Sequence, residues 1–364
     1  MEISLEVRKP RIPEYFDIVF LSETRLRITT PVTSFMLEGE SVRLLRKLLP
    51  YFKGDLTIEE IRDLSGVPAD TLASIVERLR HRQLLFDEQR TDYRGLMPAL
   101  VRRYQQEAAF FARKTGYLER YAPIRRLRDS SIILVGLGPV GLHLLKSLLG
   151  TGVGELKIID HERVHHADLA STLYSERDVG RLRTEAAIDG IDQGAHRSTV
   201  HAYPVEVQRV EWVDVLQGVD VVILCSDRRA TLDHRLLNRV CLQNSRNWIS
   251  ARLEGDFGEV GPLVIPQKSA CFACYELRME SNIGGLEQSP APESPGVGTS
   301  EGCGALPPFA QLIAAYVSLE VIRLITGYEQ PMTVGGVLSI DLSRYRNKLN
   351  RVFRVPDCPA CASR

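Results

Sequence analysis

This chain has no net charge, no long uninterrupted apolar stretch and only seven cysteines. Its 364 residues carry 46 basic and 46 acidic side chains, so the formal net charge is zero, which argues against a broad nucleic-acid-binding surface or a polybasic membrane patch. The longest apolar run, around residues 312–325, is interrupted by Ser318, Glu320 and Arg323 and falls short of a bilayer span. Because no signal-peptide pattern opens the chain, we expect a cytoplasmic protein that binds neither membrane nor nucleic acid.

Four of the seven cysteines form two Cys-x-x-Cys pairs. A two-residue gap lets both sulfurs of a pair face one ion, so the pattern predicts a tetrahedral zinc site that ties the C-terminal tail back to its domain. Buried free thiols are the alternative, but two such spacings would then be accidental. A disulfide framework is a weaker alternative, because thiols stay reduced in the cytoplasm, where we expect this protein. The paired residues are Cys271 with Cys274 and Cys358 with Cys361, while Cys225, Cys241 and Cys303 remain single.

Residues 1–90 have the pattern of a small winged-helix domain. Apolar residues alternate as in strands or recur at helical spacing, and Thr57-x-x-Glu60 is a capping box. Winged helices most often bind DNA. An extended peptide that adds a strand to the sheet and packs on the third helix is the other reading, because that helix has no dense basic face. The expected elements are strands at 16–20, 26–29 and 84–86 and helices at 41–49, 57–65 and 69–82.

The rest of the chain alternates strands and helices. A helical connector is expected over 91–130, followed by a domain over 131–364 with a doubly wound, mostly parallel, Rossmann-like α/β sheet. A Gly-, Pro- and Ser-rich segment over 281–305 reads as a flexible loop, either a cover for the active site or a linker. The expected elements are strands at 131–135, 155–160, 219–225 and 335–340 and helices at 142–149 and 307–325.

A glycine turn follows the first of these strands. Gly136, Gly138 and Gly141 form a G-x-G-x-x-G motif that aims backbone amides and a helix N-terminus at phosphate. Asp160, at the end of the next strand, has the position that binds ribose hydroxyls, in a dinucleotide as much as in ATP. Asp227 ends a third strand, where it can hold Mg²⁺ against phosphates or cap a helix.

These residues carry a family resemblance. The runs 135–141, 152–160 and 178–185, the strand ending at Asp227, both cysteine pairs and the helix at 307–327 resemble the ThiF/MoeB superfamily, the relatives of ubiquitin-activating enzymes. The resemblance covers about residues 95–364. It implies a homodimer that binds ATP and Mg²⁺, adenylates a carboxylate and holds a structural zinc ion.

The resemblance also assigns roles residue by residue. It implies that the three glycines, Asp160 and Glu162 bind the nucleotide, that Arg183 replaces a phosphate-binding lysine, and that Asp227 holds Mg²⁺. Two family arginines are missing, because Ser171 and Gln106 stand in their places, and an asparagine has become Asp168, which adds negative charge. Nearby cations could replace them, and the candidates are His165, His166, Arg177 and Arg181.

The N-terminal domain narrows the expected function. A winged-helix clamp ahead of such a domain resembles the branch that modifies ribosomally made precursor peptides, with the layout of the enzymes of microcin C and pantocin A biosynthesis. We therefore expect an ATP-dependent enzyme that binds a leader peptide and activates a peptide carboxylate, such as a Glu side chain, for dehydration and cyclisation. Asp227 and Arg183 would be its catalytic residues. Cys303 could serve as a nucleophile, although the reaction needs none.

Three other functions remain open from the sequence. The first is adenylation of the C-terminus of a sulfur-carrier protein, against which the extra N-terminal domain argues. The second is a non-catalytic peptide-binding scaffold, which Ser171 and Gln106 favour. The third is a DNA-binding regulator with a nucleotide sensor, which the neutral net charge disfavours.

Overall fold

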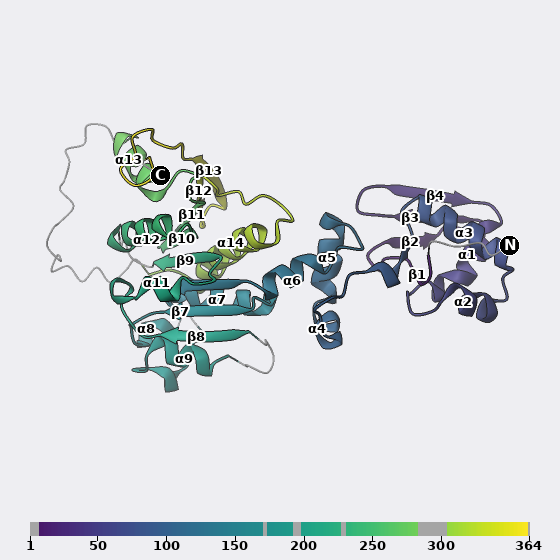
Figure 1. Cartoon of the computed structure of the whole chain (residues 1–364), viewed down its shortest axis with the longest axis horizontal. Helices are drawn as coiled ribbons and strands as arrows, with labels where there is room; N and C mark the ends of the chain where they lie inside the picture. Colours follow the sequence, from purple (N-terminus) through teal and green to yellow (C-terminus); the bar gives the residue numbers. More distant parts are fainter. Residues whose placement is uncertain (1–6, 170–172, 192–197, 227–230, 283–303, 363–364) are drawn as a thin grey trace. The chain divides into compact units, whose positions relative to one another are not determined.

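The computed structural model describes the chain except for residues 1–6, 170–172, 192–197, 227–230, 283–303 and 363–364 (Figure 1). The chain divides into two compact units, Met1–Arg125 and Arg126–Arg364. Each unit is described by itself.

The first unit pairs a small antiparallel sheet with three helices. The sheet order is β2-β3-β4, so β4 is an edge strand within the described residues. A strand at β4 was not expected from the sequence, because its Phe-Met-Leu run masks the alternation. The elements are β1 (Pro10–Arg11), β2 (Asp17–Phe20), β3 (Arg25–Thr29), β4 (Ser34–Glu38), α1 (Ser41–Leu48), α2 (Ile58–Ser65), α3 (Ala69–His81) and β5 (Phe86–Asp87), which pairs with β1.

Local signals set the helix ends of this unit. Thr57 and Glu60 form the expected capping box at the start of α2, and Gly66 ends that helix with φ +65°. The apolar faces of α1, α2 and α3 meet the sheet around fully buried Leu26, Ile28 and Leu72. The unit therefore has its own hydrophobic core.

Three helices follow in the segment where the sequence predicts a helical connector. A buried ion pair joins this segment to Glu88, the residue that follows β5. Arg120 donates to Glu88 at 2.6 Å, and both side chains are almost completely buried. The Tyr117 hydroxyl donates to the same carboxylate at 2.9 Å, and the Arg120 guanidinium lies 3.9 Å from the centre of the Tyr117 ring. The helices are α4 (Pro98–Arg103), α5 (Gln105–Thr115) and α6 (Ala122–Arg128).

The second unit is built on an eight-stranded sheet with the order β13-β12-β11-β10-β9-β6-β7-β8 (Figure 1). Strands β10 to β8 in that order are parallel, and β11 to β13 are antiparallel, so the expected mostly parallel, Rossmann-like fold is confirmed. The strands are β6 (Ser131–Val135), β7 (Glu155–Ile159), β8 (Thr199–Tyr203), β9 (Val221–Ser226), β10 (Asn247–Glu254), β11 (Phe257–Val264), β12 (Gly336–Asp341) and β13 (Arg346–Arg351).

Helices and short helical turns pack around this sheet. They are α7 (Pro139–Thr151), α8 (His166–Leu169), α9 (Arg183–Asp189), α11 (Trp212–Val215), α12 (Thr231–Gln243), α13 (Phe272–Asn282) and α14 (Pro307–Thr326). Within the described residues, α14 alone has the length and composition to cross a bilayer. Its buried residues recur at helical spacing, from Ala310 through Ile313 and Val317 to Val321, and the helix packs on α7 and the sheet. This pattern is that of a core helix.

We predict that Arg120→Ala loosens the first unit, because the buried Glu88 carboxylate loses its ion pair at 2.6 Å and keeps only Arg11, at 3.6 Å. The free energy of local opening around residues 84–93 and 117–121 should fall by about 3–5 kcal/mol. Hydrogen–deuterium exchange resolved by peptide measures it. Arg94→Ala, which removes a 91% exposed side chain paired with Asp92, is the control and should leave exchange in these peptides nearly unchanged. Equal effects of the two variants would contradict the assignment.

Candidate functional site

The glycine turn lies where β6, β9 and α7 come closest. Gly136 has φ +89°, and a Cβ atom there would lie 2.2 Å from the Cys225 carbonyl oxygen of β9. A Cβ atom on Gly141, in the first turns of α7, would lie 1.9 Å from the Gly136 oxygen. Both positions therefore exclude any side chain, and α7 begins directly behind the turn, with Gly138 as its N-cap.

The turn sits at the point where the strand order reverses. From β6 the sheet runs through β7 and β8 on one side and returns to β9 on the other. In open α/β sheets, ligands bind outside the carboxyl ends of the strands at such a point. Gly136 follows β6, and Asp160 follows β7. The amide at the N-terminus of α7 and the Asp160 carboxylate therefore face the same end of the sheet.

Backbone amides hold both oxygens of the Asp160 carboxylate. Leu137 of the glycine turn donates to Oδ2 at 2.7 Å, and Glu162 donates to Oδ1 at 2.7 Å. The side chain is buried, and this burial raises the pKa of Asp160 although the two amides and Arg183 oppose the rise. Asp160 thus joins the glycine turn to the segment that follows β7.

Arg183, at the start of α9, is surrounded by three carboxylates. Its Nη2 donates to both oxygens of Asp168, at 2.9 and 3.0 Å. Its Nη1 contacts Glu162 and lies 3.8 Å from Asp160. Burial alone would lower the pKa of this guanidinium, but the three acids raise it overall. This set, Asp160, Glu162, Asp168 and Arg183, is called the acid cluster below, and its single cation is outnumbered.

The extra carboxylate at Asp168 therefore has a partner that the sequence did not reveal. The sequence predicts only added negative charge near phosphate, whereas Asp168 is buried and forms a bidentate pair with Arg183. Tyr174 also joins the cluster, since its hydroxyl donates to the Leu137 carbonyl at 3.1 Å. The Tyr174 pKa is raised, chiefly by burial. No short motif marks these contacts, because they link residues distant in the chain.

The remaining predicted site residues lie outside the described residues, among the replacement cations, or in the first unit. Asp227, Ser171 and Cys303 lie outside the described residues, and β9 ends at Ser226. Among the replacement cations, Arg181 pairs with Asp178 and Asp189, and the His166 ring lies 3.6 Å from Glu176. His165 and Arg177 are exposed and form no ion pair within the described residues. Gln106 lies on α5 in the first unit.

The four paired cysteines converge as expected. All four sulfur atoms lie within 4.8 Å of one another, and all four residues are buried. Cys271 and Cys358 approach to 3.7 Å, Cys274 and Cys361 to 3.6 Å, and Cys271 and Cys274 to 3.9 Å. A zinc ion with four sulfurs at about 2.3 Å requires sulfur–sulfur edges of about 3.8 Å. The donor set and its size therefore fit tetrahedral zinc.

Hydrogen bonds around the cysteines fasten the C-terminal tail to α13. The Val355 amide donates to Cys274 Sγ at 3.4 Å, which lowers the pKa of that thiol although burial opposes it. Burial raises the pKa of Cys361 to about 11. Arg278 of α13 donates to the Phe353 carbonyl at 2.9 Å. The tail thus meets the domain through the sulfur cluster and through its backbone.

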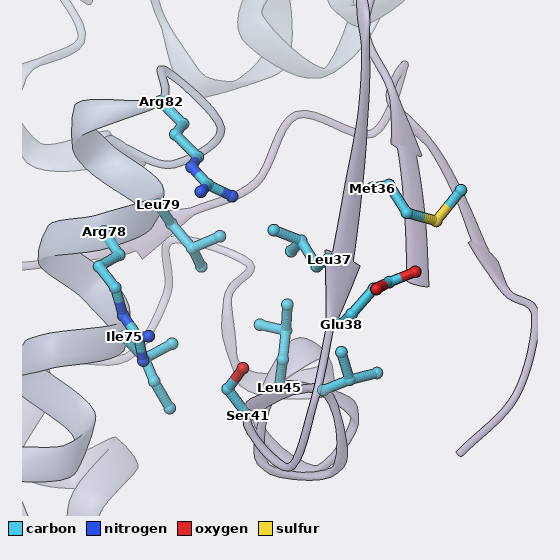
Figure 2. A pocket seen from close by; sticks show the side chains of 10 residues that line it. Met36, Leu37, Glu38, Ser41, Leu45, Ile75, Arg78, Leu79 and Arg82 are labelled. Carbon is cyan, nitrogen blue, oxygen red and sulfur yellow. The ribbon is translucent and has the colours of Figure 1, made fainter. Parts of the chain in front are cut away.

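A second candidate site is a groove in the first unit, between β4 and α3. This groove is a cavity of about 170 Å³ with an apolar floor, and Figure 2 shows Leu37 of β4 and Leu79 of α3 facing each other across it. Two arginines line it, Arg78 from α3 and Arg82 from the C-cap position directly after that helix. The full lining is Met36, Leu37, Glu38, Ser41, Val42, Leu45, Ile75, Arg78, Leu79 and Arg82.

Among the residues that the structure describes, no strand pairs with the outer backbone edge of β4, beside this groove. Thr30 donates to the Thr33 carbonyl, and Gly39 donates to the Thr24 carbonyl, so alternate residues of β4 bond to β3. The amides and carbonyls of Ser34, Met36 and Glu38 consequently point away from β3, toward the free edge. A free edge beside an apolar floor is the arrangement that accepts an added peptide strand.

Comparison with known proteins gives a family and a fold. A model of the ThiF family matches residues 108–360. The adenylyltransferase and sulfurtransferase UBA4 of Kluyveromyces lactis is 25% identical over 251 residues, covering 65% of this chain and 51% of UBA4. The sulfur carrier protein ThiS adenylyltransferase of Escherichia coli is 24% identical over 238 residues, covering 65% of this chain and 88% of its own. This chain spans about half the length of the curated relatives it matches first.

Solved structures extend the likeness to the first unit. MccB of E. coli matches with a TM-score of 0.65 and 16% identity, covering 97% of this chain and 99% of MccB. PaaA matches with a TM-score of 0.69 and 18% identity, covering 93% of this chain and 99% of PaaA. At these identities the likeness establishes the fold. The resemblance to the ThiF/MoeB superfamily predicted from the sequence is confirmed by the family model, and the solved structures show that both units share the fold of MccB and PaaA.

We predict that Arg183→Met destabilises the second unit by about 4 kcal/mol, because buried Asp160 and Asp168 and half-buried Glu162 lose their cation. The pKa of Asp160 is raised in the folded chain, and a carboxyl with a raised folded pKa loses stability as pH rises through that pKa. The deficit of the variant should therefore grow as pH rises above the usual titration range of an Asp carboxyl. Urea denaturation followed by the fluorescence of the buried Trp212 and Trp248 measures it.

Arg181→Met is the matched control for this experiment, because its pairs with Asp178 and Asp189 are partly exposed. It should change the stability much less than Arg183→Met does and show little added pH dependence. A deficit for Arg183→Met that does not change with pH would show that the acid cluster is not charged as described.

We predict one zinc ion per chain, lost on treatment with a strong chelator or in Cys358→Ser. Without the ion, trypsin should cleave the tail after Arg354, a residue that bonds to the Gln267 and Cys361 carbonyls in the intact structure. Elemental analysis and limited proteolysis measure the two effects. Cys241→Ala, which removes a buried thiol outside the cluster, should retain zinc. Zinc retention by Cys358→Ser would rule out the four-cysteine site.

Proposed function

The chain belongs to the ThiF family, and from that premise we propose that it uses ATP to adenylate a carboxylate of a ribosomally made precursor peptide. The groove between β4 and α3 would hold the leader of that peptide, and the acid cluster and glycine turn would bind the nucleotide. The product is a peptide that has lost water by cyclisation, as in the biosynthesis of peptide antibiotics. The protein would act in the cytoplasm as a homodimer.

One observation supports a peptide substrate most directly. The first unit contains a groove with an apolar floor and a free strand edge. The sulfur-carrier adenylyltransferases match 65% of the chain, whereas the MccB and PaaA folds match 97% and 93% of it and so include most of this unit. MccB has been solved with ATP and in complex with N-formylated MccA. An adenylating domain joined to a peptide clamp is what this substrate class requires.

The geometry at the end of the sheet supports nucleotide binding. The turn at Gly136 and Gly138 leaves backbone amides and the N-terminus of α7 open to phosphate. Asp160 would accept ribose hydroxyls, and Glu162 lies beside it. Arg183 would reach phosphate by exchanging part of its contact with the acid cluster. From the family resemblance, Asp227 would hold Mg²⁺, which would offset phosphate charge.

The chemistry needs no covalent nucleophile from the protein. A substrate carboxylate oxygen attacks the α-phosphorus of ATP, and pyrophosphate leaves. An amide nitrogen or other nucleophile of the same peptide then attacks the activated carbonyl carbon, loses its proton and displaces AMP. The peptide loses one water for each ring closed. The enzyme contributes orientation and charge stabilisation, which together supply most of the acceleration in such reactions.

Two other functions have a specific observation in their favour. The names of the sequence relatives favour adenylation of a sulfur carrier's C-terminus. The neutralised Arg183 favours a scaffold that binds peptide without turnover, since the described residues near Asp160 offer more negative than positive charge. In the proposed domain organisation, residues 1–90 bind the leader peptide, residues 91–130 connect the two domains, and residues 131–364 adenylate the substrate carboxylate.

The test is pyrophosphate exchange into ATP by the full chain with Mg²⁺. The substrates are synthetic peptides encoded by short reading frames beside its gene and, separately, a sulfur-carrier protein ending in Gly-Gly. We expect exchange with one peptide, together with a mass decrease of that peptide equal to whole water molecules and release of AMP. Exchange with the carrier alone would establish the second function, and peptide binding without exchange would establish the scaffold.

Gly141→Ala tests whether pyrophosphate exchange depends on the glycine turn. Its Cβ would meet the Gly136 oxygen at 1.9 Å and displace the turn. Exchange should fall at least about a hundredfold, as when an oriented donor is lost, while peptide binding to the first unit persists. Gly150→Ala, in α7 at a position open to a Cβ atom, should keep full exchange.

A further inference from the structure

The two arginines of the groove carry an inference about the peptide itself, which rests on the proposed clamp. We propose that the groove selects an extended leader segment in which two carboxylates, two residues apart, lie beside an apolar side chain on the same face of the strand. Arg78 and Arg82 would bind the carboxylates, and the floor at Leu37 and Leu79 would hold the apolar residue.

The charge of the groove is uncompensated. Within the described part of the chain, neither Arg78 nor Arg82 lies within ion-pair distance of a carboxylate, and Arg78 bonds only to the Ser74 carbonyl, at 3.3 Å. Glu38, the acid in the lining, is neutralised by Arg25 at 2.9 Å. The groove therefore presents two cations and no free anion. Such a surface attracts an acidic partner and repels a basic one.

The spacing of the arginines matches a strand. Arg78 lies on α3, and Arg82 is the residue that caps the end of this helix, so the two are four residues apart, which corresponds to about 6 Å along a helix. Residues i and i+2 of a strand project to one face and lie about 6.6 Å apart. Figure 2 shows the helix lying alongside β4, with Arg82 and Arg78 on the helix side of the groove and Leu37 of β4 facing them. A peptide paired with the free edge of β4 would thus place alternate side chains opposite both cations.

The apolar floor adds the second element of selection. Leu45 and Ile75 join Leu37 and Leu79 there, and the floor residues from α1 and α3 are almost fully buried. An acidic polymer without apolar side chains, such as DNA, would leave this floor empty and would not pair with the free strand edge. An extended peptide uses the floor, the edge and the cations together.

The test measures binding of short fluorescein-labelled peptides to the full chain without ATP. The peptides share an alternating Leu/Thr sequence and carry Glu, Gln or Lys at two positions on the face of the Leu residues. A fourth peptide has both Glu residues moved by one place, to the opposite face. The Glu peptide should bind about tenfold more tightly than the Lys peptide at low salt, and the difference should shrink as salt rises.

Variants assign the effect to the groove. Arg78→Gln/Arg82→Gln should abolish the preference for Glu over Lys but leave the Gln peptide bound. Arg62→Gln/Arg90→Gln removes two exposed charges outside the groove lining and should preserve the preference. Equal binding of the Glu and Lys peptides, equal binding of the shifted peptide, or no binding of any peptide would overturn the proposal. Tighter binding of a short DNA duplex that depends on the same two arginines would also overturn it.

A negative result in this binding experiment can be told apart from a negative result in the exchange assay. Binding here is measured without nucleotide, so an inactive adenylation site leaves the result unchanged. Conversely, a peptide that is adenylated but shows no dependence on Arg78 and Arg82 would retain the proposed function and remove this inference.

Discussion

The second unit depends on one buried cation. Arg183 joins three acids that come from separate segments: Asp160 and Glu162 after β7, and Asp168 on α8. Asp160 in turn bonds to the glycine turn through the Leu137 amide. A single guanidinium therefore links α8 to the end of the sheet where the glycine turn lies, and its planar fork suits this role better than the point charge of a lysine. Under the proposed function, the same residue would bind phosphate fully only after it released some of these acids.

The two units divide the chemistry between different kinds of structure. In the second unit, strand ends and glycine backbones leave little freedom, because a single methyl group on Gly136 or Gly141 would collide with a carbonyl oxygen. In the first unit, the groove is lined by an exposed strand edge and by long arginine side chains. Rigid parts suit a reaction with fixed geometry, whereas adaptable parts suit recognition of a chain that must be gripped and released.

Short-range patterns carried most of what the sequence could predict. The sheet class followed from buried strands and the glycine motif, and the cysteine cluster followed from two local spacings. The strand β4 was missed because Phe35, Met36 and Leu37 are consecutive, and β13 because an exposed edge strand is polar, as Arg346 and Lys348 are here. The Asp168–Arg183 pair could not be predicted either, since it depends on side-chain directions set by tertiary packing. The groove likewise arises only when α3 and β4 are placed side by side.

The cysteine cluster also has a consequence during synthesis. Cys271 and Cys358 are 87 residues apart, and the span between them includes α14 and the last two strands of the sheet. A ribosome must therefore complete all of that span before the second pair of sulfurs exists. Until then the first pair has no partner sulfurs with which to complete a four-ligand site. A zinc ion held there would therefore join parts of the second unit that are synthesised far apart in time, and it would bind with all four sulfurs only after nearly the whole chain has been made.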